Sequence, residues 1–152
     1  MEAISPFSST HAYVTSEGNH EKCKSCPGVP SAGIPTNNFT EYHSRFFSVG
    51  SFGAGFVSGT GSPRYYSFNQ GLTHFLVCSA EAYAYDSGAT FIANQLAFIK
   101  KDLATANQAA QRATQPWIVV LIHKAWWMQM DAYADFTPVF MDAKVDIIFT
   151  GQ

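Results

Sequence analysis

The stretch Trp117-Ile118-Val119-Val120-Leu121-Ile122-His123 decides the fold class of this chain. Six consecutive apolar residues, four of them β-branched, precede the histidine, and such runs are typical of strands buried on both faces of a sheet. Similar apolar runs occupy residues 74–79 and 145–149, and weaker strand candidates occupy 13–16 and 65–68. We therefore predict that the three continuous runs form buried strands.

Two helical patterns separate these buried runs. Between residues 90 and 112, apolar side chains recur at spacings of four and three, as on one face of an amphipathic helix. These side chains are Ile92, Leu96, Ile99, Leu103 and Ala106. A shorter helix is expected over 136–144, with Pro138 in its first turn, where proline is tolerated. The alternation of strands and helices implies crossover connections, so we predict an α/β fold with a largely parallel sheet and functional residues at the carboxyl ends of its strands.

Length and composition limit the organisation and the partners. The 152 residues are enough for one domain, and 47% of them are hydrophobic. Only 13% are charged, the formal net charge is -2, and no basic run is present, so we expect no nucleic-acid partner. The longest uncharged apolar stretch, 116–122, is far shorter than a bilayer span. We therefore expect no membrane partner either.

Residues 22–64 differ in amino-acid composition from the rest of the chain. Gly and Pro recur throughout this segment, which predicts a long loop excursion over the surface. Cys23 and Cys26 form a single C-x-x-C within it and are interpreted as loop cysteines, whereas Cys78 is interpreted as a small core residue. Disulfide pairing stays open. Asn38 begins an N-glycosylation sequon, which together with the cysteines favours a secreted protein.

Side chains that bind metals or move protons follow two of the predicted strands. Glu17-Gly18-Asn19-His20-Glu21 comes directly after 13–16. Its glycine permits a sharp turn, and the next two residues offer an amide oxygen and an imidazole. His123 follows the buried run 117–122. Taken singly, the first motif is explained by an ordinary turn and the second by a hydrogen-bonded strand end. Together with Gly151 after a third strand, they indicate a site shared by the strand ends.

These motifs resemble those of the purple acid phosphatases, a family within the calcineurin-like metallophosphoesterases. That family has five strand-end motifs in order: G-D-x-G, G-D-x-x-Y, G-N-H-[DE], V-x-x-H and G-H-x-H. The third is present as Gly18-Asn19-His20-Glu21 and the fourth as Val120-Leu121-Ile122-His123. Residues 38–46, 65–75 and 145–149 also look similar, so the resemblance spans essentially the whole chain. It implies a metallophosphoesterase β-sandwich with flanking helices, of which residues 1–152 form part.

The resemblance also implies a reaction and the residues for it. The family uses a dinuclear metal centre, an Fe(III) with a divalent iron, zinc or manganese, to activate a water molecule that attacks phosphate monoesters. Asn19 and His123 resemble ligands of the divalent metal. His20 is similar to the family's catalytic and substrate-binding histidine, which contacts the phosphate and assists the leaving alkoxide.

Three of the family's five motifs have no counterpart in this sequence. The first two are absent, and the chain ends at Thr150-Gly151-Gln152, where the fifth motif would place its first histidine. We therefore expect a domain truncated at both ends. One amide oxygen and one imidazole do not offset the charge of two metal ions, so this chain alone is expected to show no phosphatase turnover and no stoichiometric iron.

Two other interpretations of the same sequence stay open. The first is a truncated, non-catalytic descendant that binds phosphate-like ligands or a partner through the retained loops. The second is an unrelated α/β domain with chance motifs. That second interpretation predicts that Asn19 and His123 lie far apart in the folded chain.

Overall fold

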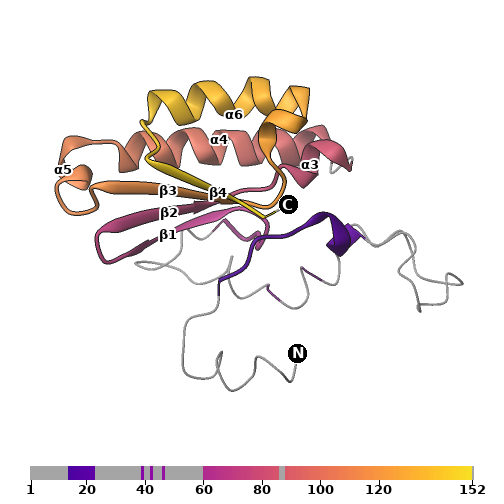
Figure 1. Cartoon of the computed structure of the whole chain (residues 1–152), viewed down its shortest axis with the longest axis horizontal. Helices are drawn as coiled ribbons and strands as arrows, with labels where there is room; N and C mark the ends of the chain where they lie inside the picture. The colour runs from indigo at the N-terminus through magenta and orange to yellow at the C-terminus, as the bar shows by residue number, and fades with distance from the viewer. Residues whose placement is uncertain are drawn as a thin grey trace, which may run out of the picture.

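One mixed four-stranded sheet forms the centre of the computed structural model, which describes residues 14–22, 39, 42, 46, 60–85 and 88–151 (Figure 1). β1 and β2 are antiparallel, whereas β2, β3 and β4 are mutually parallel. The strands, in their order across the sheet, are β1 Tyr66–Gln70, β2 Thr73–Val77, β3 Trp117–Ile122 and β4 Ile147–Thr150. The predicted α/β class is confirmed. A second sheet, as in a sandwich, does not occur among the residues that the structure describes.

A tight turn joins the two antiparallel strands. Gly71 adopts a φ of 57°, a conformation that glycine accepts without steric cost. The turn sets the register of the hairpin, in which Phe68 pairs with Phe75 and their rings stack with centroids 5.0 Å apart. Aromatic cross-strand pairs of this kind stabilise a hairpin.

The two long helices cover one face of the sheet (Figure 1). They are α4 Ala89–Ala106 and α6 Met130–Asp142. Apolar side chains from both helices and from the sheet form the main core, which includes Ile99, Phe136 and Val120. Shorter helical elements complete the described chain: η2 Asn19–Lys22, α3 Glu81–Ala84, α5 Ala109–Arg112 and η3 Trp126–Met128.

Both predicted helices differ from the observed ones in their limits. The helix expected over 90–112 is divided into α4 and α5, because the backbone is extended at Gln108. The helix expected over 136–144 begins earlier, at Met130, so Pro138 lies inside α6 and not in its first turn. Ala132, Phe136 and Phe140 are buried at spacings of four, and this stripe lengthens the helix toward its N-terminus.

The opposite face of the sheet is covered in part by the segment that precedes Asn19. Val14 packs against a small cluster that contains Tyr66 and Val77. The strand predicted over 13–16 is wrong, because residues 14–18 form no regular element. The carbonyl oxygen of Thr15 accepts hydrogen bonds from the hydroxyls of Tyr66 at 2.6 Å and Tyr42 at 3.1 Å. Side chains therefore satisfy a backbone group that a strand would offer to a neighbour.

Several sequence expectations concern residues that the structure does not describe. Most of the predicted excursion 22–64 lies outside the described residues, as do Cys23, Cys26 and Asn38. Cys78 is fully buried in the main core, as predicted. None of the helices in the described part of the chain has the length and apolar character needed to span a bilayer.

Candidate functional site

Asn19 and His123 lie together at the carboxyl-terminal edge of the parallel strands, although 104 positions separate them in the sequence. The side-chain oxygen Oδ1 of Asn19 is 3.0 Å from Nε2 of His123. His123 is the first residue after β3, and Asn19 begins η2. The fold therefore brings the two motif residues to one point, which is contrary to what chance motifs in an unrelated fold predict.

Two glycines enclose the imidazole of His123. A Cβ atom placed on Gly18 would be 3.0 Å from Cε1 and Nε2 of the ring, and one placed on Gly151 would be 3.0 Å from Nδ1. The amide of Gly151, which follows β4, also donates to the carbonyl oxygen of His123 at 2.9 Å. Neither glycine has a positive φ. Glycine is required here because the ring approaches the backbone closely on both sides.

Substitution of the first of these glycines gives a specific expectation. In Gly18→Ala the new Cβ would lie 3.0 Å from the His123 ring and from the Oε2 atom of Glu21, so one or both of these side chains must shift. We expect a stability loss of about 1–3 kcal/mol, typical of overpacking, and changed ¹⁵N chemical shifts of the His123 ring. Gly61→Ala is the control: its φ of 69° makes alanine strained there as well, but no atom lies within 4 Å, so the ring signals should stay unchanged even though stability falls. Unaltered His123 signals in Gly18→Ala would contradict the packing described above.

Glu21 closes the turn that presents Asn19. Its Oε2 atom accepts the amide of Gly18 at 2.6 Å, and its own amide donates to the carbonyl oxygen of Gly18 at 3.2 Å. In a helix N-terminal cap, a carboxylate often accepts the backbone amide of the residue three positions earlier. Gly18 and Glu21 have this spacing, so the contact could have been predicted from the sequence. His20, between Asn19 and Glu21, is exposed to solvent.

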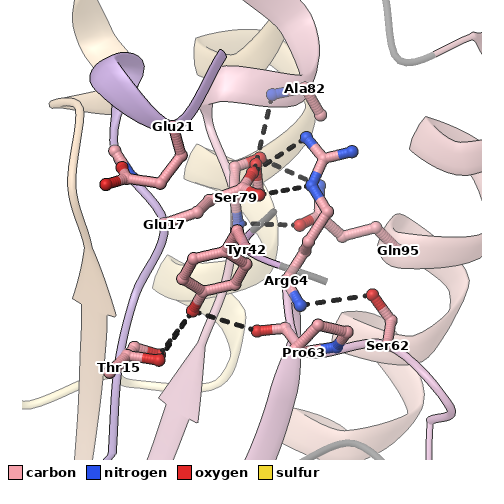
Figure 2. A network of polar contacts seen from close by, with 11 residues as sticks. Thr15, Glu17, Glu21, Tyr42, Ser62, Pro63, Arg64, Ser79, Ala82 and Gln95 are labelled. Carbon is pink, nitrogen blue, oxygen red and sulfur yellow. Dashed lines mark hydrogen bonds and ion pairs between the residues drawn. The ribbon is translucent and has the colours of Figure 1, made fainter. Parts of the chain in front are cut away.

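A buried polar network lies behind this turn (Figure 2). The carboxylate of Glu17, 1% exposed, accepts hydrogen bonds from Nε and Nη2 of Arg64, the latter at 2.9 Å, and from the hydroxyl of Ser79. Gln95 of α4 binds the backbone of Ser79 with both ends of its amide, at 2.7 and 3.0 Å. Burial raises the pKa of Glu17, and the hydrogen bonds and charge of Arg64 oppose that shift.

Sequence reasoning did not identify any member of this network. The sequence offered one indication that Glu17 matters, which is its position directly before the G-N-H-E motif. Gln95 is four residues before Ile99, so helical spacing places it on the buried face of α4. The contact between Glu17 and Arg64 joins residues 47 apart in the chain, and it became visible only in the folded structure.

Glu81, the first residue of α3, is a second buried carboxyl group near the site. Its side chain is 0% exposed, and neither carboxylate oxygen has a hydrogen-bond partner among the described residues. Burial raises the pKa of Glu81 to about 7; the positive charge of Lys124 opposes the shift, and the negative charges of Glu17 and Glu21 add to it. The group therefore changes its protonation near neutral pH.

The donor atoms at this edge do not form a complete dinuclear metal site. No group of three or more His, Cys, Asp or Glu side chains that could hold a metal ion occurs within the described ranges. Asn19 and His123 provide two neutral donors, whereas two metal ions need several donors each and carboxylates to offset their charge. The described residues therefore fit part of one cation site.

Comparison with known proteins identifies relatives. Seven curated proteins match at 24–31% identity. Purple acid phosphatase 18 of Arabidopsis thaliana is 27% identical over 99% of this chain and 32% of its own length. Acid phosphatase type 7 of Danio rerio is 27% identical over 90% of this chain and 26% of its own length. Purple acid phosphatase 15 of Arabidopsis thaliana is 30% identical over 88% of this chain and 21% of its own length.

The matches extend over most of this chain but over a limited part of each relative. The chain spans a third or less of the length of the curated relatives that it matches. No family model matches the chain, and no solved structure matches it significantly. The chain is therefore related to the purple acid phosphatases, through a similarity that covers most of its residues.

Proposed function

We propose that this chain is part of a metal-dependent acid phosphatase that hydrolyses phosphate monoesters. The observation that supports this most directly is the 3.0 Å separation between Oδ1 of Asn19 and Nε2 of His123. The relatives are named as acid phosphatases, and this supports the reaction class. Secretion, which the Asn38 sequon favours, belongs to the same proposal.

The separation of the two donor atoms is compatible with one shared cation. Two ligands that bind an ion at roughly 2.1 Å and at right angles to each other lie about 3.0 Å apart. An amide oxygen and an imidazole nitrogen both suit zinc, manganese and divalent iron. Without a metal, the contact is a hydrogen bond in which Nε2 of His123 donates to Asn19. Metal binding is then expected to remove that proton and to be weaker at low pH.

His20 is proposed as the residue that contacts the phosphate and protonates the leaving oxygen. It follows Asn19 directly in η2 and is exposed, so an anionic substrate at this edge could reach its imidazole. A dinuclear centre, when complete, would supply the activated water. The described residues supply two of the ligands that such a centre needs.

A second function is favoured by the small number of donor side chains. Because no cluster of three or more metal-binding side chains occurs in the described part of the chain, a non-catalytic role in which the same loops bind phosphate or a partner is the alternative. Because this chain alone is expected to show no turnover in either case, the flanking reading frame separates the two functions: G-D-x-G and G-D-x-x-Y upstream together with G-H-x-H downstream would support the enzyme.

A titration with Mn²⁺ tests the cation site directly. The paramagnetic ion is added to the isotopically labelled chain, and NMR signals are followed as they broaden. We expect broadening to begin at Asn19 and His123, and to require at least about tenfold more Mn²⁺ in Asn19→Ala and His123→Ala. Inorganic phosphate and p-nitrophenyl phosphate are then added to test substrate binding and turnover.

The matched control is a histidine at the other end of the sheet. His74 of β2 pairs with Ile118, far along β3 from His123, and contacts Asn69 at 2.7 Å and Asp102 at 2.9 Å. His74→Gln should bind Mn²⁺ as the unmodified chain does. Broadening that is unaffected by His123→Ala, or turnover that survives it, would remove the proposed site.

A further inference from the structure

Glu17 connects four separate parts of the fold immediately before the site. It precedes Gly18, binds Arg64 ahead of β1, and binds the hydroxyl of Ser79 just after β2 (Figure 2). Through Ser79 it is joined to Gln95 of α4 and to the first turn of α3, where the amide of Ala82 donates to the Ser79 hydroxyl at 3.1 Å. The position of residue 17 is therefore fixed relative to the sheet and its helices.

Arg64 is itself held in place. Its guanidinium carbon is 4.0 Å from the centre of the Phe39 ring and 4.2 Å from that of the Phe91 ring, and the residue is 3% exposed. Two N–H groups donate to the two carboxylate oxygens of Glu17, a geometry that fixes direction as well as distance. A lysine could not reproduce this pairing.

Stability alone does not explain such a pair. Replacing a buried ion pair by apolar side chains of similar volume is often neutral or stabilising, because both charges lose their hydration when they are buried. Glu17, however, is only two residues before Asn19 in the sequence, and Gly18 between them has no side chain. Asn19 is therefore held from one side by Glu17 and from the other by the hydrogen bond between Gly18 and Glu21.

We propose that the cluster of Glu17, Arg64 and Ser79 is a positioning device that sets the side chain of Asn19 against His123. Its importance for catalysis rests on the proposed function. The contact between Asn19 and His123 can nevertheless be measured without metal or substrate, so the two proposals fail separately.

The test replaces the pair and observes the contact. In the double variant Glu17→Leu/Arg64→Leu the chain is expected to stay folded, while the ¹⁵N signals of the His123 ring and of the Asn19 amide move as far as the ring signals move in Asn19→Ala. Arg64→Lys and Ser79→Ala should move the same signals by a smaller amount. If Mn²⁺ binds the unmodified chain, the double variant should bind it about tenfold more weakly.

The control is the ion pair at the opposite end of the parallel strands. Arg112 binds Asp146 at 2.7 Å, and Asp146 accepts the amide of Ile118 near the start of β3. Asp146→Asn should leave the His123 and Asn19 signals unchanged. The proposal is overturned if the folded double variant retains the original signals. If the double variant does not fold, unchanged signals in both Arg64→Lys and Ser79→Ala overturn it.

Discussion

Glu17→Leu is expected to destabilise the fold by about 3–5 kcal/mol, which is the usual cost of removing one member of a buried ion pair. Arg64 would remain between two aromatic rings, 3% exposed, and would lose the carboxylate that accepts two of its N–H groups. The double variant Glu17→Leu/Arg64→Leu removes both charges and should recover most of this loss. Urea unfolding of the single and double variants measures the difference.

The decisive quantity is the difference between the stability loss of the double variant and the sum of the losses of the two single variants. Each single variant should be less stable than the double variant, because a single variant keeps one buried charge and removes the opposite charge that it binds. Asp142→Asn, which alters an exposed carboxylate at the end of α6, is the control and should cost far less. Single-variant losses that simply add in the double variant would contradict the account of a paired, buried charge.

Glu81→Gln is expected to remove a large pH dependence of stability. The pKa of Glu81 is raised to about 7 in the folded chain from the ordinary value of 4.5, so the folded state binds the proton more tightly. The stability linked to this group is complete below pH 4.5 and is lost as the pH rises toward 7 and above. The shift corresponds to about 3 kcal/mol between pH 4.5 and 8.

Urea unfolding at several pH values between 4.5 and 8 checks this expectation. Glu81→Gln should show a flatter profile than the unmodified chain and should gain stability relative to it as the pH rises. A buried amide without a partner costs the same at every pH, so only the slope is diagnostic. Asp142→Asn, at an exposed position, is the control and should retain the original profile. An unchanged slope in Glu81→Gln would assign the pH dependence to other groups.

The sequence pattern predicted the central strand better than the edge strand. The prediction that 145–149 is a buried strand is wrong, because β4 lies at the edge of the sheet and Phe149 is 58% exposed. The limits of β3 agree with the predicted run at both ends, because six apolar residues lie between Pro116 and a polar histidine. The segment 13–16 has similar β propensity but is not a strand, since tyrosine hydroxyls from distant parts of the chain bind Thr15. Long-range side-chain bonds of this kind leave no local pattern in the sequence.

Only those residues of the candidate site that belong to sequence motifs could be predicted. Asn19 and His123 were identified from their positions at strand ends and from the resemblance to a family, and the fold brings them together. Arg64 and Ser79 were not identified, because an arginine beside tyrosines and a serine after a strand have many ordinary explanations. Their roles depend on where Glu17 lies in three dimensions. The family roles of Asn19, His20 and His123 stay predictions until metal binding is measured.

The backbone hydrogen bond from Gly151 to His123 has a mechanical consequence. It ties the end of an outer strand to the backbone of His123, and the imidazole lies directly against Gly151, with no side chain between them. β4 has an exposed apolar surface at Phe149, 58% exposed, only two residues before Gly151. A displacement of β4 at Gly151 is therefore expected to displace His123 as well.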